Sequence, residues 1–358
     1  MSKFLFVVPS FASGGAERAV TNLASELVRQ GENVTVVKYF NMEQEYMVDE
    51  RVHVINLSGG NMDVYENIGY LKKIRMLREI LKAQNPDYIL PFLPQVTLHT
   101  ALAGFDMGKK IIHTVRNNPV VMPPNKMLRF VCNAIIRFSW KTIVQNETQK
   151  VYYPKKIHNK IYVLFNAVSA ELLHIERRKI DSTYTIIAVG RLEPQKNFSM
   201  LLRGMKIVHE KHPDVILRIY GEGSLHEQLQ TEIVDIGLSG IAQLMGRTND
   251  MKSVYTSADM FVLSSDFEGM PNTLIEAMAV GLPCVSTNCP TGPTDLIENM
   301  RNGILVPLND EKALGYAICR MIENSAEAEA MSVMARKTIR EKCSAESIVK
   351  QLIRICRE

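Results

Sequence analysis

The chain has 358 residues, more than one ordinary hydrophobic core holds, so we expect two domains. Its composition, 46% hydrophobic and 22% charged, is that of a globular protein and excludes collagen-like and disordered classes. No apolar run reaches about 18 residues, so we expect no membrane-spanning helix. The apolar N-terminal run is interrupted at Pro9, too early for a signal peptide, and predicts a buried strand.

The net charge of +4 conceals two halves of opposite sign. Residues 1–170 contain 21 Lys and Arg against 13 Asp and Glu, a net +8, whereas residues 171–358 carry a net −4. A basic first half indicates an anionic partner: a phosphate group, a nucleic acid or an anionic membrane surface. The six cysteines lack CxxC pairs and metal-type spacing, which favours reduced, mostly buried thiols in a cytoplasm over a structural disulfide.

The first half alternates apolar runs with amphipathic segments. Apolar periodicity predicts one helix that ends at Gly31 and a second, basic helix. The predicted strands cover residues 4–10, 33–39, 52–57, 87–93, 109–115, 142–146 and 160–166, and the predicted helices cover residues 16–30 and 65–84. Repeated alternation of this kind predicts a parallel sheet with helices on both faces.

The same pattern restarts after a charged, turn-prone stretch at residues 176–184. Strands are predicted at residues 185–190, 214–220, 241–246, 259–265, 283–287 and 304–308, and helices at residues 197–211, 224–236, 249–257 and from about 311 onward. The predicted fold class is therefore α/β, with two tandem Rossmann-like, doubly wound domains at residues 1–172 and 180–342. A last helix at residues 343–358 is expected to pack back toward the first domain. Because ligands of such sheets bind beyond the carboxyl ends of the strands, the two domains would face a cleft between them.

Two cations follow the first strand of the second domain. Arg191 and Lys196 lie after Gly190 on a short loop, where a planar guanidinium and a mobile ammonium suit an anion with several oxygens. A solvated surface pair is the alternative. After the next strand, Gly221 and Gly223 would let the backbone approach a ligand closely, although a plain turn fits as well.

The stretch EGMPNTLIE, which follows the strand at residues 259–265, combines a loop, a helix start and two carboxylates. Pro271 fits the first helical turn, and the amides of residues 270–273 would then form a diphosphate site at the helix N-terminus. Glu268 and Glu276 cannot bind phosphate, but their carboxylates can accept hydrogen bonds from sugar and ribose hydroxyls. The arrangement therefore suits a nucleotide sugar. The alternative is a helix-start carboxylate and an ordinary exposed helix glutamate.

Taken together, these motifs resemble glycosyltransferase family 4, a family of retaining, metal-independent nucleotide-sugar glycosyltransferases with the GT-B fold. The resemblance covers nearly the whole chain, and the combination of motifs in this order is specific, although each motif alone is not. The motifs are Gly14-Gly15-Ala16-Glu17, Val189-Gly190-Arg191-Leu192 with Lys196-Asn197, Gly221-x-Gly223, Glu268-Gly269-x-Pro271-Asn272 with Glu276-Ala277, and Gly281-x-Pro283.

The resemblance implies roles for these residues. Arg191 and Lys196 would neutralise the donor diphosphate, Glu276 would hold the ribose, and Glu268 would contact the transferred hexose. The implied donor-binding set is Gly14, Gly15, Gly190, Arg191, Lys196, Gly221, Gly223, Glu268, Gly269, Met270, Pro271, Asn272 and Glu276. The implied catalytic residues are Glu268, Arg191, Lys196 and His113, and the implied acceptor-side residues are Arg116 and Asn117, with the division of work between His113 and Arg116 left open.

The implied reaction is transfer of a hexose or N-acetylhexosamine with retention of configuration. It would need no cofactor and no metal, since the chain has no D-x-D motif and side-chain cations with a helix N-terminus can stabilise the leaving diphosphate. A UDP-sugar is favoured over a GDP-sugar, and a nucleic acid partner is not expected. A nucleotide-sugar epimerase of the same fold and a non-catalytic nucleotide-sugar-binding protein remain as alternatives.

Residues 126–141 are apolar with interleaved cations, and the predicted helix around residues 72–78 is basic. This pattern is typical of helices that lie on anionic membranes, although a buried helix with solvated charges fits residues 126–141 as well. We therefore expect a cytoplasmic protein that docks peripherally on the membrane. The expected acceptor is a glycan, here a polyprenyl-diphosphate-linked oligosaccharide of surface polysaccharide assembly.

Overall fold

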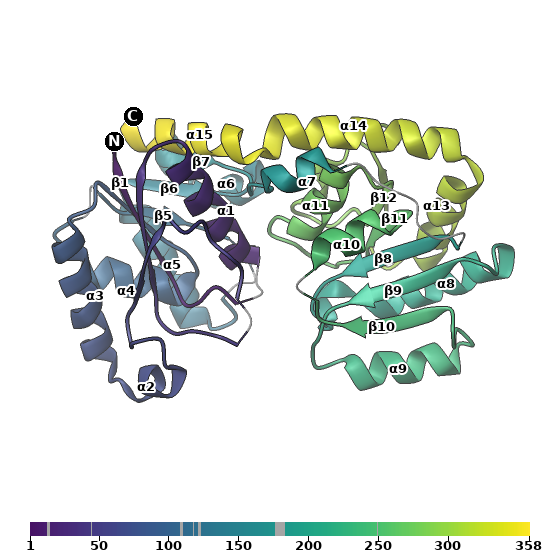
Figure 1. Cartoon of the computed structure of the whole chain (residues 1–358), viewed down its shortest axis with the longest axis horizontal. Helices are drawn as coiled ribbons and strands as arrows, with labels where there is room; N and C mark the ends of the chain where they lie inside the picture. The colour runs from purple at the N-terminus through teal and green to yellow at the C-terminus, as the bar shows by residue number, and fades with distance from the viewer. Residues whose placement is uncertain are drawn as a thin grey trace. The chain divides into compact units, whose positions relative to one another are not determined.

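The structure is a computed structural model that describes residues 1–12, 15–43, 45–107, 110–116, 118–120, 123–175, 183–248 and 250–358. It divides into two compact units, one formed by Met1–Ala167 with Ala345–Glu358 and the other by Val168–Ser344 (Figure 1). Both units are α/β, with parallel pairing between the strands of each sheet. Within the described residues, no helix has the length and hydrophobicity needed to cross a membrane.

The first unit contains a four-stranded sheet in the order β3-β2-β1-β4 and a three-stranded sheet in the order β5-β6-β7. An isolated parallel bridge, Ile89↔Ile111, lies between the two sheets. The strands are β1 (Lys3–Val8), β2 (Asn33–Lys38), β3 (His53–Asn56), β4 (Tyr88–Pro91), β5 (Ile112–Thr114), β6 (Lys141–Val144) and β7 (Ile161–Val163). All seven predicted first-half strands are confirmed.

Helices cover both faces of the first sheet. Successive side chains of each strand point to opposite faces, so every strand contributes apolar side chains to a core on each side. Phe4 and Phe6 pack in the core that contains α1 and α15, whereas Leu5 and Val7 face the core formed by α3 and α4. The helices are α1 (Gly15–Arg29), α2 (Met62–Asn67), α3 (Tyr70–Gln84), α4 (Pro94–Ala103), α5 (Lys126–Phe138), α6 (Glu147–Tyr152), the 3-10 helix η2 (Lys155–Lys160) and α15 (Ala345–Arg357).

One helix prediction in this unit was wrong in extent. The single basic helix expected at residues 65–84 is two helices, α2 and α3. The chain is extended at Ile68 (ψ 125°) and at Gly69 (ψ 148°), which are the C-cap of α2 and the N-cap of α3. The helical spacing of apolar residues continues across the break between α2 and α3, so the sequence pattern does not reveal that the helix is interrupted.

The second unit contains one six-stranded sheet in the order β10-β9-β8-β11-β12-β13. Numbered from the first strand of the unit, this is the 3-2-1-4-5-6 order of dinucleotide-binding folds, and the order reverses between β8 and β11. The strands are β8 (Thr185–Val189), β9 (Ile216–Tyr220), β10 (Ala242–Gly246), β11 (Met260–Leu263), β12 (Cys284–Thr287) and β13 (Ile304–Val306). Ligands of such sheets bind where the order reverses, so this edge of the sheet is where a site is expected.

Helices α8, α9 and α13 pack on one face of this sheet, and α10 and α11 contribute to the other, where Tyr255 contacts Phe261. The helices are α7 (Ala170–His174), the 3-10 helix η3 (Pro194–Lys196), α8 (Phe198–Lys211), α9 (His226–Asp235), α10 (Met251–Thr256), α11 (Asn272–Val280), α12 (Pro293–Leu296), α13 (Glu311–Glu323) and α14 (Ser325–Cys343). The doubly wound fold class predicted for the chain is confirmed.

The unit boundaries follow the packing of the chain ends. The first unit stops at Ala167 rather than at the predicted residue 172, since α7 belongs to the second unit. Helix α15 lies against α1, and Ile348 and Leu352 are fully buried in the core of the first unit. The six cysteines are free, and all except the half-buried Cys132 are buried.

Candidate functional site

Two loops at the reversal point are held together by hydrogen bonds. One follows β8 and the other follows β11, and these two strands are paired neighbours in the sheet. The Asp266 amide donates to the Gln195 carbonyl (2.9 Å), and Ser264 Oγ donates to the Lys196 carbonyl (2.7 Å). Gln195 Nε2 donates to the Phe267 carbonyl (2.8 Å). The predicted cationic loop and the predicted acidic loop therefore form one structural unit.

Lys196 and Glu268 meet across these loops. Lys196 Nζ lies 2.6 Å from Glu268 Oε1, and only 14% and 8% of the two side chains are exposed. Ser265, which is fully buried, donates its hydroxyl to the same carboxylate oxygen at 2.7 Å. A charge-assisted pair in such a shielded place is held in a defined geometry. Its atoms can contact both a phosphate and a sugar hydroxyl.

Arg191 differs from Lys196 in its surroundings. Its side chain is exposed, and in the described part of the chain its guanidinium makes no hydrogen bond or salt bridge to another side chain. Five N–H donors therefore remain available at the carboxyl end of β8 for an anion.

The glycines around these loops allow backbone segments to pack closely. A Cβ at Gly221 would lie 1.9 Å from the Gly190 carbonyl oxygen, and a Cβ at Gly223 would lie 2.4 Å from the Leu192 carbonyl oxygen. At Gly190, a Cβ would meet the Lys196 side chain at 2.7 Å. The sequence suggested that Gly221 and Gly223 let backbone approach a ligand. In the structure the backbone that approaches Gly221 and Gly223 is that of the neighbouring loop, which contains Arg191.

Helix α11 begins beside Glu268 without a side-chain cap. The sequence predicts Pro271 in the first turn of this helix. In the structure Pro271 is instead the N-cap residue, one position before the first turn. A Cβ at Gly292 would lie 2.6 Å from Pro271 Cδ, and Thr291 donates its hydroxyl to the Glu268 carbonyl. The loop after β12 therefore packs against the segment that leads into α11. The predicted residues Gly269, Met270 and Asn272 lie in this segment and at the start of the helix. An uncapped helix N-terminus favours negative charge.

Glu276 lies one turn inside α11 and is not an exposed helix residue. It is 3% exposed, and its Oε2 accepts a hydrogen bond of 2.9 Å from the hydroxyl of the fully buried Tyr255. Burying a carboxylate costs free energy unless it is hydrogen-bonded, and a glutamate on the surface avoids this desolvation cost.

The acceptor-side candidates lie in the first unit. His113 is in β5 and is 4% exposed, and burial lowers its pKa to about 4. Arg116 is 8% exposed, stacks on the Phe92 ring at 4.4 Å and donates to Asn166 Oδ1 at 2.9 Å. Gly15 is the first residue of α1. Gly14 and Asn117 lie outside the described residues.

Arg116 borders a small cavity in the first unit, together with Thr114, Arg129 and Tyr153. Among the described residues, its Nε and Nη2 atoms have no hydrogen-bond partner although they are buried, and burial lowers the pKa of Arg116 to about 9. Buried donors without partners are rare, and they favour an anionic or strongly polar ligand at this place.

Three residues of the second-unit site were not predicted from the sequence: Ser265, Tyr255 and Thr291. Ser265 could have been found, because it lies two residues after the end of β11, at the same edge as Glu268. No sequence pattern pointed to Tyr255, because it belongs to a different helix and lies 21 positions before Glu276. Thr291 acts through a backbone carbonyl, which a side-chain motif does not record.

Comparison with known families gives two matches in chain order. The family model described as Glycosyltransferase Family 4 matches residues 13–172, and the model described as Glycosyl transferases group 1 matches residues 183–324. The two matches correspond closely to the two units of the structure.

Similar proteins of known name include two bacterial glycosyltransferases. A GalNAc-alpha-(1->4)-GalNAc-alpha-(1->3)-diNAcBac-PP-undecaprenol alpha-1,4-N-acetyl-D-galactosaminyltransferase from Campylobacter jejuni is 28% identical, with 88% of this chain and 87% of the relative covered. A UDP-Gal:alpha-D-GlcNAc-diphosphoundecaprenol alpha-1,3-galactosyltransferase from Escherichia coli is 30% identical, with 80% and 78% covered. Among solved structures, Anabaena HepE in complex with UDP and glucose superposes with a TM-score of 0.82 at 17% identity, and both chains are fully covered.

Proposed function

Because the chain belongs to glycosyltransferase family 4 and has the GT-B fold, we propose that it moves a hexose or N-acetylhexosamine from a UDP-sugar to a polyprenyl-diphosphate-linked glycan. The configuration at the transferred carbon is retained, and no metal takes part. The observation that carries the proposal is the Lys196–Glu268 pair, which lies beside an uncapped helix N-terminus where the strand order reverses.

The donor diphosphate binds between cationic groups and the start of α11. Arg191 and Lys196 neutralise its charge, and the amides at the start of α11 contribute hydrogen bonds and the helix dipole. Glu276, oriented by Tyr255, accepts hydrogen bonds from the ribose hydroxyls. Glu268 accepts from hydroxyls of the hexose.

The proposed chemistry needs no protein nucleophile. The bond between the anomeric carbon and the diphosphate oxygen breaks, and the acceptor hydroxyl oxygen bonds to that carbon on the same face. The acceptor proton passes to the departing diphosphate oxygen, and the UDP leaves. Charge develops on the diphosphate as the bond breaks, so positioned cations lower the barrier most.

The acceptor diphosphate is the partner that we propose for Arg116. Its two buried donors without a partner in the described residues suit phosphate oxygens. The names of the relatives from C. jejuni and E. coli both contain a diphosphate-linked undecaprenol acceptor, which supports the proposal for this chain. His113 is neutral at physiological pH and hydrogen-bonds the sugar without adding charge.

Docking on an anionic membrane would bring such an acceptor to the enzyme. Met127, Phe130 and Phe138 lie at helical spacing on one side of α5 and are 72%, 71% and 84% exposed. Lys126 and Arg137 are exposed next to this apolar stripe, which we call the α5 face. Exposed aromatic side chains flanked by cations suit the headgroup region of an anionic bilayer at the cytoplasmic leaflet.

The donor proposal is tested with a panel of UDP- and GDP-sugars, in which a ligand that binds raises the midpoint of thermal unfolding by mass action. We expect a shift with a UDP-sugar and transfer to a diphosphate-linked acceptor that persists in EDTA. Conversion of the donor in the absence of any acceptor would instead identify an epimerase. Donor binding without any transfer would identify a non-catalytic binding protein.

The docking proposal is tested by co-sedimentation with liposomes of anionic or neutral lipid. We expect binding to anionic vesicles that decreases when Phe130 and Phe138 are both changed to Ser. Val333→Ser, at an exposed apolar position on α14 (59% exposed), is the control and should bind like the wild type. Equal binding to both lipids, or none, would refute docking.

A further inference from the structure

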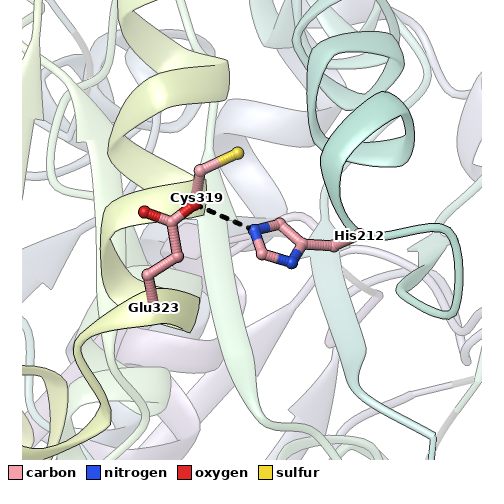
Figure 2. Close-up of side chains that lie close together, drawn as sticks. All are labelled: His212, Cys319 and Glu323. Atoms are coloured by element: carbon pink, nitrogen blue, oxygen red, sulfur yellow. Dashed lines mark hydrogen bonds and ion pairs between the residues drawn. The ribbon is translucent and has the colours of Figure 1, made fainter.

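Three side chains of different chemistry converge at the carboxyl ends of α8 and α13 (Figure 2). His212 is the C-cap of α8, and Cys319 and Glu323 lie one turn apart on α13. His212 Nε2 is 3.2 Å from Glu323 Oε1. The ligand atoms of the three residues all lie within 4.8 Å of one another. None of the three residues belongs to the site described above.

The three groups match the ligands of zinc. Tetrahedral Zn²⁺ takes thiolate, imidazole and carboxylate ligands at about 2.0 to 2.3 Å, which sets ligand atoms about 3.3 to 3.8 Å apart. The imidazole and carboxylate are already near that separation, and the thiol has to approach by about 1 Å at most. Three protein ligands leave a fourth position for water.

Helix packing fixes the arrangement. Helices α8 and α13 make a close contact at a pair of glycines, where a Cβ on Gly315 would lie 2.8 Å from the Gly204 carbonyl oxygen. Both helices run from this contact toward the cluster, so their carboxyl ends meet there, and helix dipoles place partial negative charge at that end. An open surface hollow of about 490 Å³ is lined by Cys319 and Glu323 and gives an ion access.

Other charged groups near the cluster have their own contacts. Lys211 lines the same hollow, with its Nζ 5.4 Å from the centre of the Tyr316 ring. Arg320 pairs with Glu327 at 2.9 Å. Burial raises the pKa of the Cys319 thiol. Because zinc binds the thiolate, uptake of the ion at this site releases a proton and weakens at acidic pH.

We propose that His212, Cys319 and Glu323 bind one Zn²⁺ ion, which fastens the carboxyl end of α8 to that of α13. Helix α8 begins directly after Asn197 in the cationic loop and runs back along the sheet for about 21 Å over its 14 residues. The ion therefore lies at the edge of the sheet opposite Lys196 and Glu268. Its role is structural, and it does not depend on the proposed donor chemistry.

The test uses the untagged full-length chain, stripped with a chelator and titrated with Co²⁺ and then Zn²⁺. Cobalt bound to a thiolate gives a charge-transfer band in the near ultraviolet, which reports ligation by cysteine directly. We expect the band at one equivalent of Co²⁺ and its loss on adding Zn²⁺. Cys319→Ser should abolish the band, and His212→Gln and Glu323→Gln should weaken Zn²⁺ binding about tenfold or more.

Matched controls are Cys132→Ser, at a half-buried cysteine of the first unit, and His226→Gln, at an exposed histidine of α9. Both should retain the band and wild-type Zn²⁺ affinity. The exposed Glu323 can be changed without disturbing the core, so the test does not rely on the buried cysteine alone. Absence of a band from the folded wild type, or Zn²⁺ binding that is equal in all variants, would overturn the proposal, whether or not UDP-sugars bind.

Discussion

Lys196 Nζ and Glu268 Oε1 lie 2.6 Å apart in a largely buried pair at the end of two neighbouring strands. We assign Lys196 to the diphosphate and Glu268 to the hexose. The positive charge of the lysine and the negative charge of the glutamate therefore compensate each other within the protein. Ser265 supports the carboxylate independently of the lysine, since its hydroxyl donates to the same oxygen.

Lys196→Ala should lower kcat for sugar transfer by about 10²- to 10³-fold, as for loss of one preorganised group that stabilises developing charge. Steady-state kinetics with a UDP-sugar measures this effect. Lys206→Ala, at an exposed lysine of α8, is the control and should leave kcat unchanged. A kcat for Lys196→Ala near that of the wild type, in a variant with an unaltered thermal midpoint, would remove the lysine from the mechanism.

Tyr255→Phe should weaken donor binding while changing kcat little. The substitution keeps the buried ring and removes the hydroxyl that donates to Glu276 at 2.9 Å. A hydrogen bond to a charged group contributes about 1.5 to 3 kcal/mol, so the Kd for the UDP-sugar should rise about tenfold or more. Tyr162→Phe, at a half-buried tyrosine of β7, is the control. An unchanged Kd in Tyr255→Phe would show that Glu276 needs no orienting partner.

Gly221→Ala should destabilise the second unit far more than Gly237→Ala. Both glycines have positive φ (+143° and +80°), but a Cβ at Gly221 would lie 1.9 Å from the Gly190 carbonyl oxygen, whereas a Cβ at Gly237 would meet nothing within 4 Å. Gly237→Ala isolates the backbone cost of about 1 to 2 kcal/mol. Each kcal/mol lowers the thermal midpoint by about 2 to 4 °C in a domain of this size. Equal midpoints would mean that the two loops separate easily.

His113 makes the first unit sensitive to acid. Its pKa is lowered to about 4 in the folded protein, against an ordinary value of 6.5. As pH falls from about 6.5 to about 4, the unfolded chain binds a proton that the folded chain does not, so stability is lost across this window and levels off below it. The full shift corresponds to about 3 kcal/mol.

The variant His113→Asn removes the titrating group. Urea unfolding of wild type and variant at several pH values should give a stability difference that shrinks as pH falls through the window. A difference that does not change with pH would mean that the pKa of His113 is the same in the folded and the unfolded protein.

The sequence was sufficient for the architecture and for much of the candidate site, for a physical reason. Strands and helices follow from apolar periodicity, and parallel strands bring their carboxyl ends to one edge, so Arg191, Lys196 and Glu268 could be grouped without coordinates. What could not be predicted depended on three-dimensional packing. The burial of Glu276 and its contact with Tyr255 require two helices to meet, and the break between α2 and α3 left the periodicity intact.

Helix α15 has a consequence for how the chain is made. The second unit is continuous in sequence, from Val168 to Ser344, but the core of the first unit includes Ile348, Val349 and Leu352 from the last helix. On the ribosome, the second unit can therefore fold completely before the first unit, although its residues are synthesised later than most of the first. Until α15 emerges, the apolar face of α1 lacks the helix that covers it, so the core of the first unit is the last to be completed during synthesis.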